Sequence, residues 1–247
     1  MSKHIREYQE KLINVISKIY DTQQKNIDKV AQMMTETILK NKSIYAFGPS
    51  HAGMIVEEMV YRAGGLALVN PIHAAALLPN ARPISITTSM ERLPGYATVL
   101  IKASGIKKDD FLLIHSVSAR IPIVIEMAIK AKEIGVRVAG IVNMDFATKV
   151  TSLDSSGKMM YEVCDIVIDN CGELGDACIS IEGLPQKVAP TSTVAGAFIV
   201  NSIVIRVCEN LIKKDTEPPI FRSANIDGSN EFNLQLLEKY KDRIHYM

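Results

Sequence analysis

The sequence has no excess of positive charge. Lys and Arg number 28 against 27 for Asp and Glu, which gives a formal net charge of +1 at pH 7. Because binding to a nucleic-acid backbone requires a basic surface, this balance argues against a nucleic-acid partner. The hydrophobic share of 47% and the charged share of 22% are typical of a packed globular domain, so disordered, collagen-like and coiled-coil classes are not expected.

Cysteine is scarce and has no metal-binding spacing. The four cysteines include no C-x-x-C pair, which is the spacing that zinc and redox sites usually have. We therefore predict free thiols, no metal and no cofactor. A G-x-G-x-x-G turn after a strand is also missing, which disfavours a nicotinamide dehydrogenase.

Signals for export and membrane insertion are missing as well. The start, MSKHIREYQEKLINV, does not follow a basic segment with a continuous apolar core, as a secretory signal does. The most apolar stretch, residues 195–207, contains Asn201, Ser202 and Arg206 and is too short to cross a bilayer. We therefore expect a protein of the reducing cytoplasm that has no membrane partner.

What the sequence does contain is an alternation of helical and strand patterns. Residues 5–40 carry apolar side chains at helical spacing and predict two amphipathic helices with a break near Asp21. Beyond Lys42, short runs rich in β-branched residues alternate with helical patterns. These runs are apolar on both faces, as strands between two helix layers are. They cover residues 43–47, 66–69, 111–115, 137–142 and 165–168.

This alternation predicts a three-layer α/β/α fold with a doubly wound parallel sheet of about five strands. We predict a single domain over 1–247: N-terminal helices over 1–41, the α/β core over 42–212, and a C-terminal arm over 213–247 that ends in a helix at 230–246. In such a sheet, ligands bind at the carboxyl ends of the strands. The turns that follow strands are therefore where functional residues are expected.

The first candidate turn, residues 47–53, joins the first strand to a helix that begins near His51. Unpaired backbone N–H groups and the positive end of a helix dipole attract a phosphate at such a position. Gly48 lets the backbone approach a ligand closely, and Ser50 adds a hydroxyl donor. The alternative is that Ser50 only caps the helix.

The second candidate turn, residues 115–122, directly follows the apolar strand FLLI. Ser116 and Ser118 lie in the turn, Arg120 can supply positive charge, and Pro122 suits the first position of the next helix.

The third candidate turn, residues 190–193, opens a long helix over 194–212. Of its residues Thr191 and Ser192, one hydroxyl can cap the helix while the other faces a ligand. Three hydroxyl-rich turns on one edge of a sheet predict a shared anion site.

At these turns the chain resembles the SIS (sugar isomerase) domain family. That family includes phosphoheptose isomerase, N-acetylmuramic acid 6-phosphate etherase and the isomerase domain of glucosamine-6-phosphate synthase. In it, a first turn G-x-S and a second turn S-x-S-G-x-[ST] line a sugar phosphate. The resemblance covers residues 30–212. A phosphosugar-binding branch of the family is similar in the segments YRAGGLALVNPI, SSGKMMYEVCDIVIDNCGELGDA, IEGLPQKVAPTSTVAG and EPPIFRSANIDG.

The resemblance implies phosphate contacts from Ser50, Ser116 and Ser118, with Thr191 and Ser192 nearby. The second turn departs from the family pattern, because Ala119 and Ile121 stand where the family has Gly and then Thr or Ser. A methyl group hinders close backbone approach, and the loss of a hydroxyl removes one donor. Phosphate binding by this turn is therefore expected to be weaker, unless Arg120 compensates.

Acid and base candidates follow the first turn. Members of the family are similar in carrying an acidic residue on this helix that moves a proton, which implies such a role for Glu57 or Glu58, with Glu58 favoured. A carboxylate in a dry pocket can remove the proton beside a carbonyl. The alternative for Glu58 is an i,i+4 ion pair with Arg62. His73 is a reserve general acid.

Two further groups of polar residues lie near the predicted edge. His51, His73 and His115 each follow or end a strand, but no metal-ligand spacing supports a zinc site, so we interpret them as polar loop histidines. Asn170, Glu173 and Asp176 lie at the Gly-rich loop CGELGDA, and they either accept hydrogen bonds from a sugar or form an ordinary turn.

The sequence thus predicts a phosphosugar-binding protein, acting as an isomerase or lyase through Glu58. The alternative is a non-catalytic phosphosugar sensor. In SIS-containing transcription regulators a DNA-binding domain precedes the sheet, but residues 1–42 are too few for one in addition to the usual helices. The family resemblance also implies a homodimer or higher homo-oligomer, in which a helix or tail reaches the neighbour's pocket.

Overall fold

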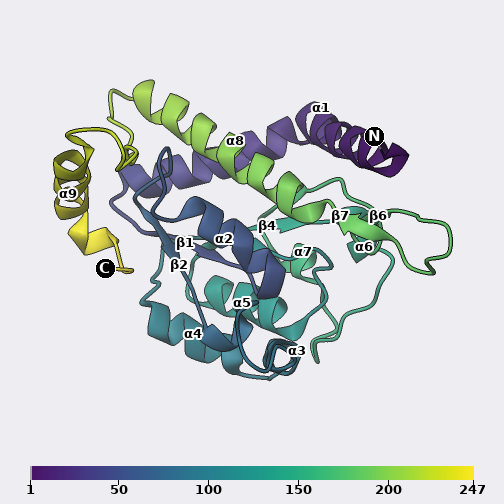
Figure 1. The fold of residues 1–247 in the computed structure, drawn as a ribbon. Coiled ribbons are helices and arrows are strands. Elements are labelled where there is room, and N and C mark those ends of the chain that lie inside the picture. Colours follow the sequence, from purple (N-terminus) through teal and green to yellow (C-terminus); the bar gives the residue numbers. More distant parts are fainter. Residues whose placement is uncertain (1) are drawn as a thin grey trace.

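Five parallel strands form the central sheet of the protein. The computed structural model describes residues 2–247. Its strands lie in the order β2-β1-β3-β4-β5, and each neighbouring pair is parallel (Figure 1). The prediction of a doubly wound sheet of about five strands is confirmed. The strands are β1 (Ile44–Phe47), β2 (Val69–Pro71), β3 (Phe111–His115), β4 (Arg137–Val142) and β5 (Ile166–Asp169).

Helices cover both faces of this sheet, which explains why the strands are apolar throughout. Successive side chains of a strand point to opposite faces. Ile44 and Ala46 of β1 pack in the core beneath α1, α2 and α8, whereas Tyr45 and Phe47 pack against α4 and α5 (Figure 1). The bounds of these helices are α1 (Lys3–Leu39), α2 (Gly53–Met59), α4 (Tyr96–Ser104), α5 (Pro122–Glu133) and α8 (Ser192–Ile212).

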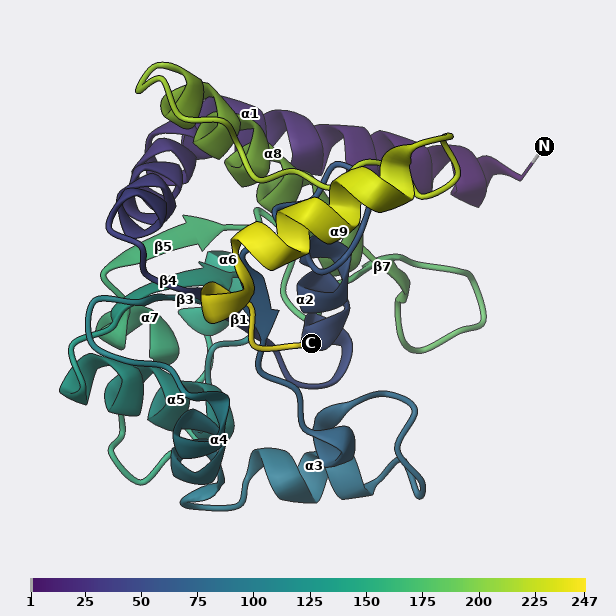
Figure 2. The same cartoon turned by 90° about the vertical axis from the view of Figure 1, so that its left-hand side faces the viewer.

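The N-terminal region is one helix, so the predicted break near Asp21 is wrong. Residues 3–39 contain no Gly or Pro, and an exposed Asp within a helix costs only about 0.7 kcal/mol or less. What changes along α1 is its surroundings. Val30 and Met34 in the second half are fully buried against α8, whereas the first half projects beyond the sheet (Figures 1 and 2). The buried face of α1 already includes Ile19, and the helix continues through Asp21 without a break.

Several predicted boundaries shift in the structure. The second strand begins at Val69 and not at Leu66, because Leu66 forms an antiparallel bridge with Ile220. An antiparallel hairpin, which the sequence did not predict, leads into α8. The remaining elements are η1 (Ser50–Ala52), η2 (Ala75–Leu77), α3 (Ile86–Glu91), α6 (Met144–Ala147), α7 (Met160–Val163), β6 (Ala177–Ile179), β7 (Val188–Pro190), α9 (Ser229–Lys239) and η3 (Lys241–Arg243).

The C-terminal arm lies at the edge of the sheet that β2 forms (Figure 1). The side chain of Asn70 in β2 donates to the carbonyl of Arg243 at 3.0 Å and accepts from the N–H of His245 at 2.6 Å. The Tyr246 hydroxyl donates to the carbonyl of Ala67 at 2.9 Å. An edge strand otherwise exposes unpaired backbone groups. The arm therefore covers β2 and fixes its position beside β1.

Helix α8 is a core helix of this fold. Within residues 2–247 it is the one helix whose length and apolar composition would suit a membrane span. Its residues Ile199, Ile203 and Val207 are fully buried, and α8 packs along α1 and α2. Apolar composition is therefore explained by packing between two helices and the sheet.

Candidate functional site

The candidate site lies where the chain leaves β1 and β3. Phe47 at the end of β1 pairs with Ile114 near the end of β3, so the turns that follow the two strands start side by side. The turn after β1 leads to α2 on one face of the sheet, and the turn after β3 leads to α5 on the other. Such a topological switch point opens a crevice at the carboxyl edge of a doubly wound sheet.

The first turn requires glycine and leaves backbone N–H groups free. A Cβ on Gly48 would lie 2.5 Å from the carbonyl oxygen of Ala52, so no other residue fits there. Ser50 has a φ of 52°. Within residues 2–247, the N–H groups of Ser50 and His51 have no acceptor, and the Ser50 hydroxyl makes no hydrogen bond. Ser50 therefore does not cap α2 in this structure.

The second turn also leaves backbone N–H groups free. Ala119 has a left-handed φ of 55°, which explains why the family pattern has glycine here. Its N–H donates to the Ser116 hydroxyl oxygen at 3.2 Å. Within the described chain, the N–H groups of Val117, Ser118 and Arg120 have no acceptor. Consecutive free N–H groups beside a left-handed residue form an anion-binding nest.

The Ala119 methyl group does not cover this nest. Ala119 is fully buried in the core beside α5, so its methyl points into the protein. Its carbonyl accepts from the N–H of Met160 at 2.9 Å, which fixes the residue from the other side. The structure thus accommodates alanine in the left-handed conformation at a cost of about 1–2 kcal/mol, and the expected obstruction is absent at this position. Pro122 begins α5, as predicted.

Arg120 is the positively charged residue of the second turn. Its side chain is half-buried, and its buried Nε atom has no hydrogen-bond partner within residues 2–247. Its carbonyl accepts from the N–H of Leu153 at 2.9 Å, which anchors the backbone of the turn. A guanidinium with a free buried N–H can donate to an anion bound in the turn.

His115 connects the first and second turns. It is only 2% exposed, so the interpretation as a polar loop histidine is wrong for this residue. Its Nδ1 lies 3.1 Å from the carbonyl oxygen of Ala52. Because a carbonyl can only accept, Nδ1 carries the proton. Burial lowers the pKa of His115, while the Ala52 carbonyl and the charge of Asp176 partly oppose that shift.

The third predicted turn already holds an anion of the chain itself. The carboxylate of Asp176 accepts from the N–H groups of Thr191 at 3.1 Å and Ser192 at 2.9 Å, and from the Ser192 hydroxyl at 2.6 Å. The amino end of α8 is thereby capped. Thr191 and Ser192 are buried, so their hydroxyls are not open to solvent.

Two buried amides at the same edge were not identified as a pair from the sequence. Asn143 and Asn170 are fully buried and directly follow β4 and β5. A Cβ on Gly172 would lie 2.8 Å from Asn143 Nδ2 and 3.2 Å from Thr191 Oγ1, so these side chains crowd one spot. Their equivalent position, one residue after a buried strand, was the signal that could have identified them. Asn143 donates to the carbonyl of Glu173 at 2.9 Å and thereby joins the loop after β4 to the loop after β5.

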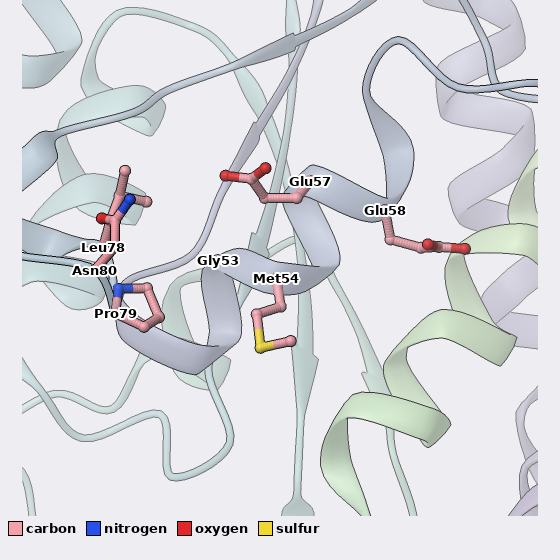
Figure 3. A pocket seen from close by; sticks show the side chains of 7 residues that line it. All are labelled: Gly53, Met54, Glu57, Glu58, Leu78, Pro79 and Asn80. Carbon is pink, nitrogen blue, oxygen red and sulfur yellow. The ribbon is translucent and has the colours of Figure 1, made fainter.

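The two glutamates of α2 point in different directions (Figure 3). A cavity of about 490 Å³ beside α2 is lined by Gly53, Met54, Glu57, Glu58, Leu78, Pro79 and Asn80. Glu58 turns toward α8, where it accepts from Asn201 at 3.0 Å and forms an ion pair with Arg62. Glu57 turns toward the opposite wall and lies 3.8 Å from His73 Nε2. The ion pair with Arg62 is the alternative that the sequence left open for Glu58.

The predicted site residues therefore fall into four groups, one of which is the pair Thr191 and Ser192 held by Asp176 at the start of α8. Gly48, Ser50 and His51 lie in the first turn, and Ser116, Ser118 and Arg120 lie in the adjacent second turn. Glu57, Glu58 and His73 lie at the cavity, whose lining does not include the hydroxyl residues. Within residues 2–247, no three His, Cys, Asp or Glu side chains gather in a way that would hold a metal ion, and the four cysteines are free.

The fold and the two turns are those of a doubly wound α/β protein whose candidate site lies at the topological switch point. A family model described as SIS domain matches residues 7–143. A UPF0309 protein of Oceanobacillus iheyensis is 47% identical over 244 residues, and one of Shouchella clausii is 46% identical over 244 residues. Each alignment covers 99% of both chains. The chain belongs to the SIS domain family, and the predicted resemblance is confirmed.

Solved structures share the fold at low sequence identity. The phosphoheptose isomerase of Francisella tularensis superposes with a TM-score of 0.54 at 12% identity, over 83% of this chain and 96% of that chain. The phosphoheptose isomerase of Neisseria gonorrhoeae gives a TM-score of 0.52 at 15% identity, over 85% of this chain and 97% of that chain. These similarities establish the SIS fold.

The burial of His115 predicts a pH dependence of stability. The folded protein keeps this imidazole neutral below its ordinary pKa of about 6.5, while the unfolded chain takes up a proton. The contribution of neutral His115 to the free energy of unfolding is complete above about pH 6.5. It is lost as the pH falls toward the lower pKa of the folded state, by at most about 1.4 kcal/mol per pH unit. Urea unfolding between pH 7.5 and 5.0 measures the slope. We expect His115→Asn to be less sensitive to pH, and equal slopes would contradict this assignment.

Proposed function

We propose that this protein binds the phosphate of a phosphorylated sugar at the switch point between β1 and β3. The observation that carries the proposal is the set of free backbone N–H groups in the two adjacent turns, at Ser50, His51, Val117, Ser118 and Arg120. Unpaired N–H groups in a nest and at the start of a helix are suited to a phosphate. Membership of the SIS family and the fold shared with phosphoheptose isomerases support this ligand class.

The predicted contacts receive different roles in this proposal. The hydroxyls of Ser50 and Ser118 donate to the phosphate together with the free N–H groups, and Arg120 adds positive charge. Ser116 shapes the second turn by accepting from Ala119. Thr191 and Ser192 are hydrogen-bonded to Asp176, so in this proposal they have a structural role and do not contact the phosphate.

The reaction that we propose is an aldose–ketose isomerisation, with a lyase reaction as the related alternative. In the isomerisation, a carboxylate removes the proton from the carbon beside the carbonyl, an enediol forms, and the proton returns to the neighbouring carbon. No oxidant or reductant is required. We assign the base to Glu57, because its carboxylate faces the cavity wall and His73. The carboxylate of Glu58 is already bonded to Arg62 and Asn201. His73 donates a proton to the carbonyl oxygen as the enediol forms, and it takes up the proton of the neighbouring hydroxyl as the new carbonyl forms.

The spacing along α2 supports one continuous site. Gly53 and Glu57 are one helical turn apart on the same face of α2, and both line the cavity. Glu57 therefore lies about 6 Å along the helix axis from the end where the phosphate would bind. The carbon chain of a sugar that extends from its phosphate along α2 brings its carbonyl end toward this carboxylate.

We also propose that the protein works in the cytoplasm, where its four free thiols stay reduced.

A ligand screen tests the phosphate assignment. Sugar phosphates of five to seven carbons, including glucosamine 6-phosphate and N-acetylglucosamine 6-phosphate, are compared with their unphosphorylated parents by thermal shift. A binding sugar phosphate at 100 times its Kd stabilises the protein by about 2.7 kcal/mol. We expect Ser118→Ala to weaken binding and Ser180→Ala, at an exposed serine of the hairpin, to leave it unchanged. Equal stabilisation by the unphosphorylated parents would refute the site.

Substitution of the two glutamates tests the reaction. We expect Glu57→Gln to slow proton transfer by about a hundredfold or more, because amide cannot accept the proton. Glu58→Gln serves as the matched control and should lose less than about tenfold, since its surface ion pair contributes only a few tenths of a kcal/mol. Incorporation of solvent deuterium at the carbon beside the carbonyl, followed by NMR, measures the step.

The opposite outcome identifies other roles. A large loss in Glu58→Gln with an active Glu57→Gln would make Glu58 the base. Binding of a sugar phosphate without any exchange in the wild-type protein would indicate a non-catalytic sensor.

We also propose that a second copy of the chain packs on the projecting half of α1. Ile5 is 65% exposed, Ile13 54% and Tyr20 60%, although such residues are usually buried. Sedimentation equilibrium should give twice the monomer mass or more, and Ile13→Asp should shift the protein toward monomer. A monomer at micromolar concentration would contradict the proposal.

A further inference from the structure

His115 occupies the junction of the two turns, and no step of the proposed reaction uses it. Phe111 and Leu113 of β3 point into the core on the side of α2 and α8, and the two-residue period places His115 on the same face. At that face the next structure above the strand is the first turn. The 3.1 Å hydrogen bond from Nδ1 to the Ala52 carbonyl joins this side chain of β3 to the turn.

We propose that His115 is a positioning residue, which holds the Ala52 carbonyl through Nδ1–H and thereby keeps the first turn in the shape that offers its free N–H groups to a phosphate. This inference rests on the proposed function. The first turn has few other restraints: η1 is three residues long, and its own ladder consists of the Ala52 N–H bonded to Pro49 and the Gly53 N–H bonded to Ser50 and His51. One buried side-chain bond is therefore a large share of what fixes it.

The conformation that His115 fixes is an unfavourable one for the chain. Ser50 has a left-handed φ of 52°, which non-glycine residues adopt rarely and only when their surroundings impose it. The carbonyl of Ala52 also lies where a Cβ on Gly48 would collide with it. The Ala52 carbonyl thus packs closely against Gly48 and also accepts the hydrogen bond from His115. Loss of the clamp should let Ser50 relax out of the binding conformation.

The second ring nitrogen is not part of this clamp. Nε2 is buried and has no hydrogen-bond partner within residues 2–247, and Asp176 is the charged group whose field acts on the ring. A substitute for His115 therefore needs a donor only at the position of Nδ1. Asparagine meets this requirement, because its Nδ2 is the same number of bonds from Cβ as Nδ1 of histidine. Glutamine places its amide one bond farther out, and leucine has no donor.

Three variants separate the clamp from simple packing. His115→Leu retains an apolar side chain of moderate size and removes the donor. His115→Gln retains a polar donor at the wrong distance. His115→Asn leaves more empty space than either but restores the donor. If His115 served only to fill the core, Asn would be the most damaging of the three; if it positions the turn, Asn is the least damaging to binding.

Two measurements are made on the full-length protein. Hydrogen exchange of residues 48–56, without ligand, reports the shape of the first turn and is expected to be faster in His115→Leu and His115→Gln and near wild type in His115→Asn. Isothermal titration with inorganic phosphate and with the sugar phosphate found by the screen gives Kd. We expect Kd to rise about five- to tenfold in Leu and Gln, as for one lost hydrogen bond, and to recover in Asn.

The outcomes distinguish this inference from the function on which it rests. If wild type and His115→Leu bind the sugar phosphate equally, or if Asn binds worse than Leu, the positioning role is refuted while phosphosugar binding stands. If the wild-type protein binds neither probe, the proposed function fails, and the role of His115 in binding fails with it. If His115→Leu does not fold, the comparison of Gln with Asn decides, since both are polar amides that differ in reach.

Discussion

Everything at the candidate site depends on the reversal of direction between β1 and β3. A parallel sheet whose neighbouring strands lead to helices on opposite faces must leave a gap at its carboxyl edge, because no helix covers both turns. The backbone there has to turn sharply, and its N–H groups find no partners in a ladder or a helix. Gly48 and the left-handed Ala119 are the local consequences, since each allows the chain to bend sharply away from its strand.

His115 shows how the sheet and the site are linked. The alternation that buries Phe111 and Leu113 continues for one more residue, and at that residue the strand places an imidazole where the pattern would place another apolar side chain. A hydrophobic residue could pack there but could not hold the Ala52 carbonyl. Burial keeps the ring neutral, which leaves the positive charge of the site to Arg120 and to the helix amino ends.

The sequence predicted the layers of the fold because each strand is apolar on both faces, and it located the turns after β1 and β3 because hydroxyl residues follow those strands. It failed where the answer depends on distant segments. The predicted break at Asp21 is absent because α1 continues as one helix beyond the sheet. The different orientations of Glu57 and Glu58 depend on Asn201 of α8, which donates to Glu58. Likewise, the sequence around Thr191 does not predict that Asp176, on the other side of the β6-β7 hairpin, caps the amino end of α8.

The cap by Asp176 also limits how many anions the edge can accept. The amino end of α8 has a positive dipole end that would otherwise attract a phosphate, but an internal carboxylate already satisfies its N–H groups. A phosphate that displaced Asp176 would leave that carboxylate without its partners beside a second anion. The proposed binding mode therefore places the dianion in the turns after β1 and β3. In that mode the cavity beside α2, which Glu57 lines, receives the remainder of the sugar.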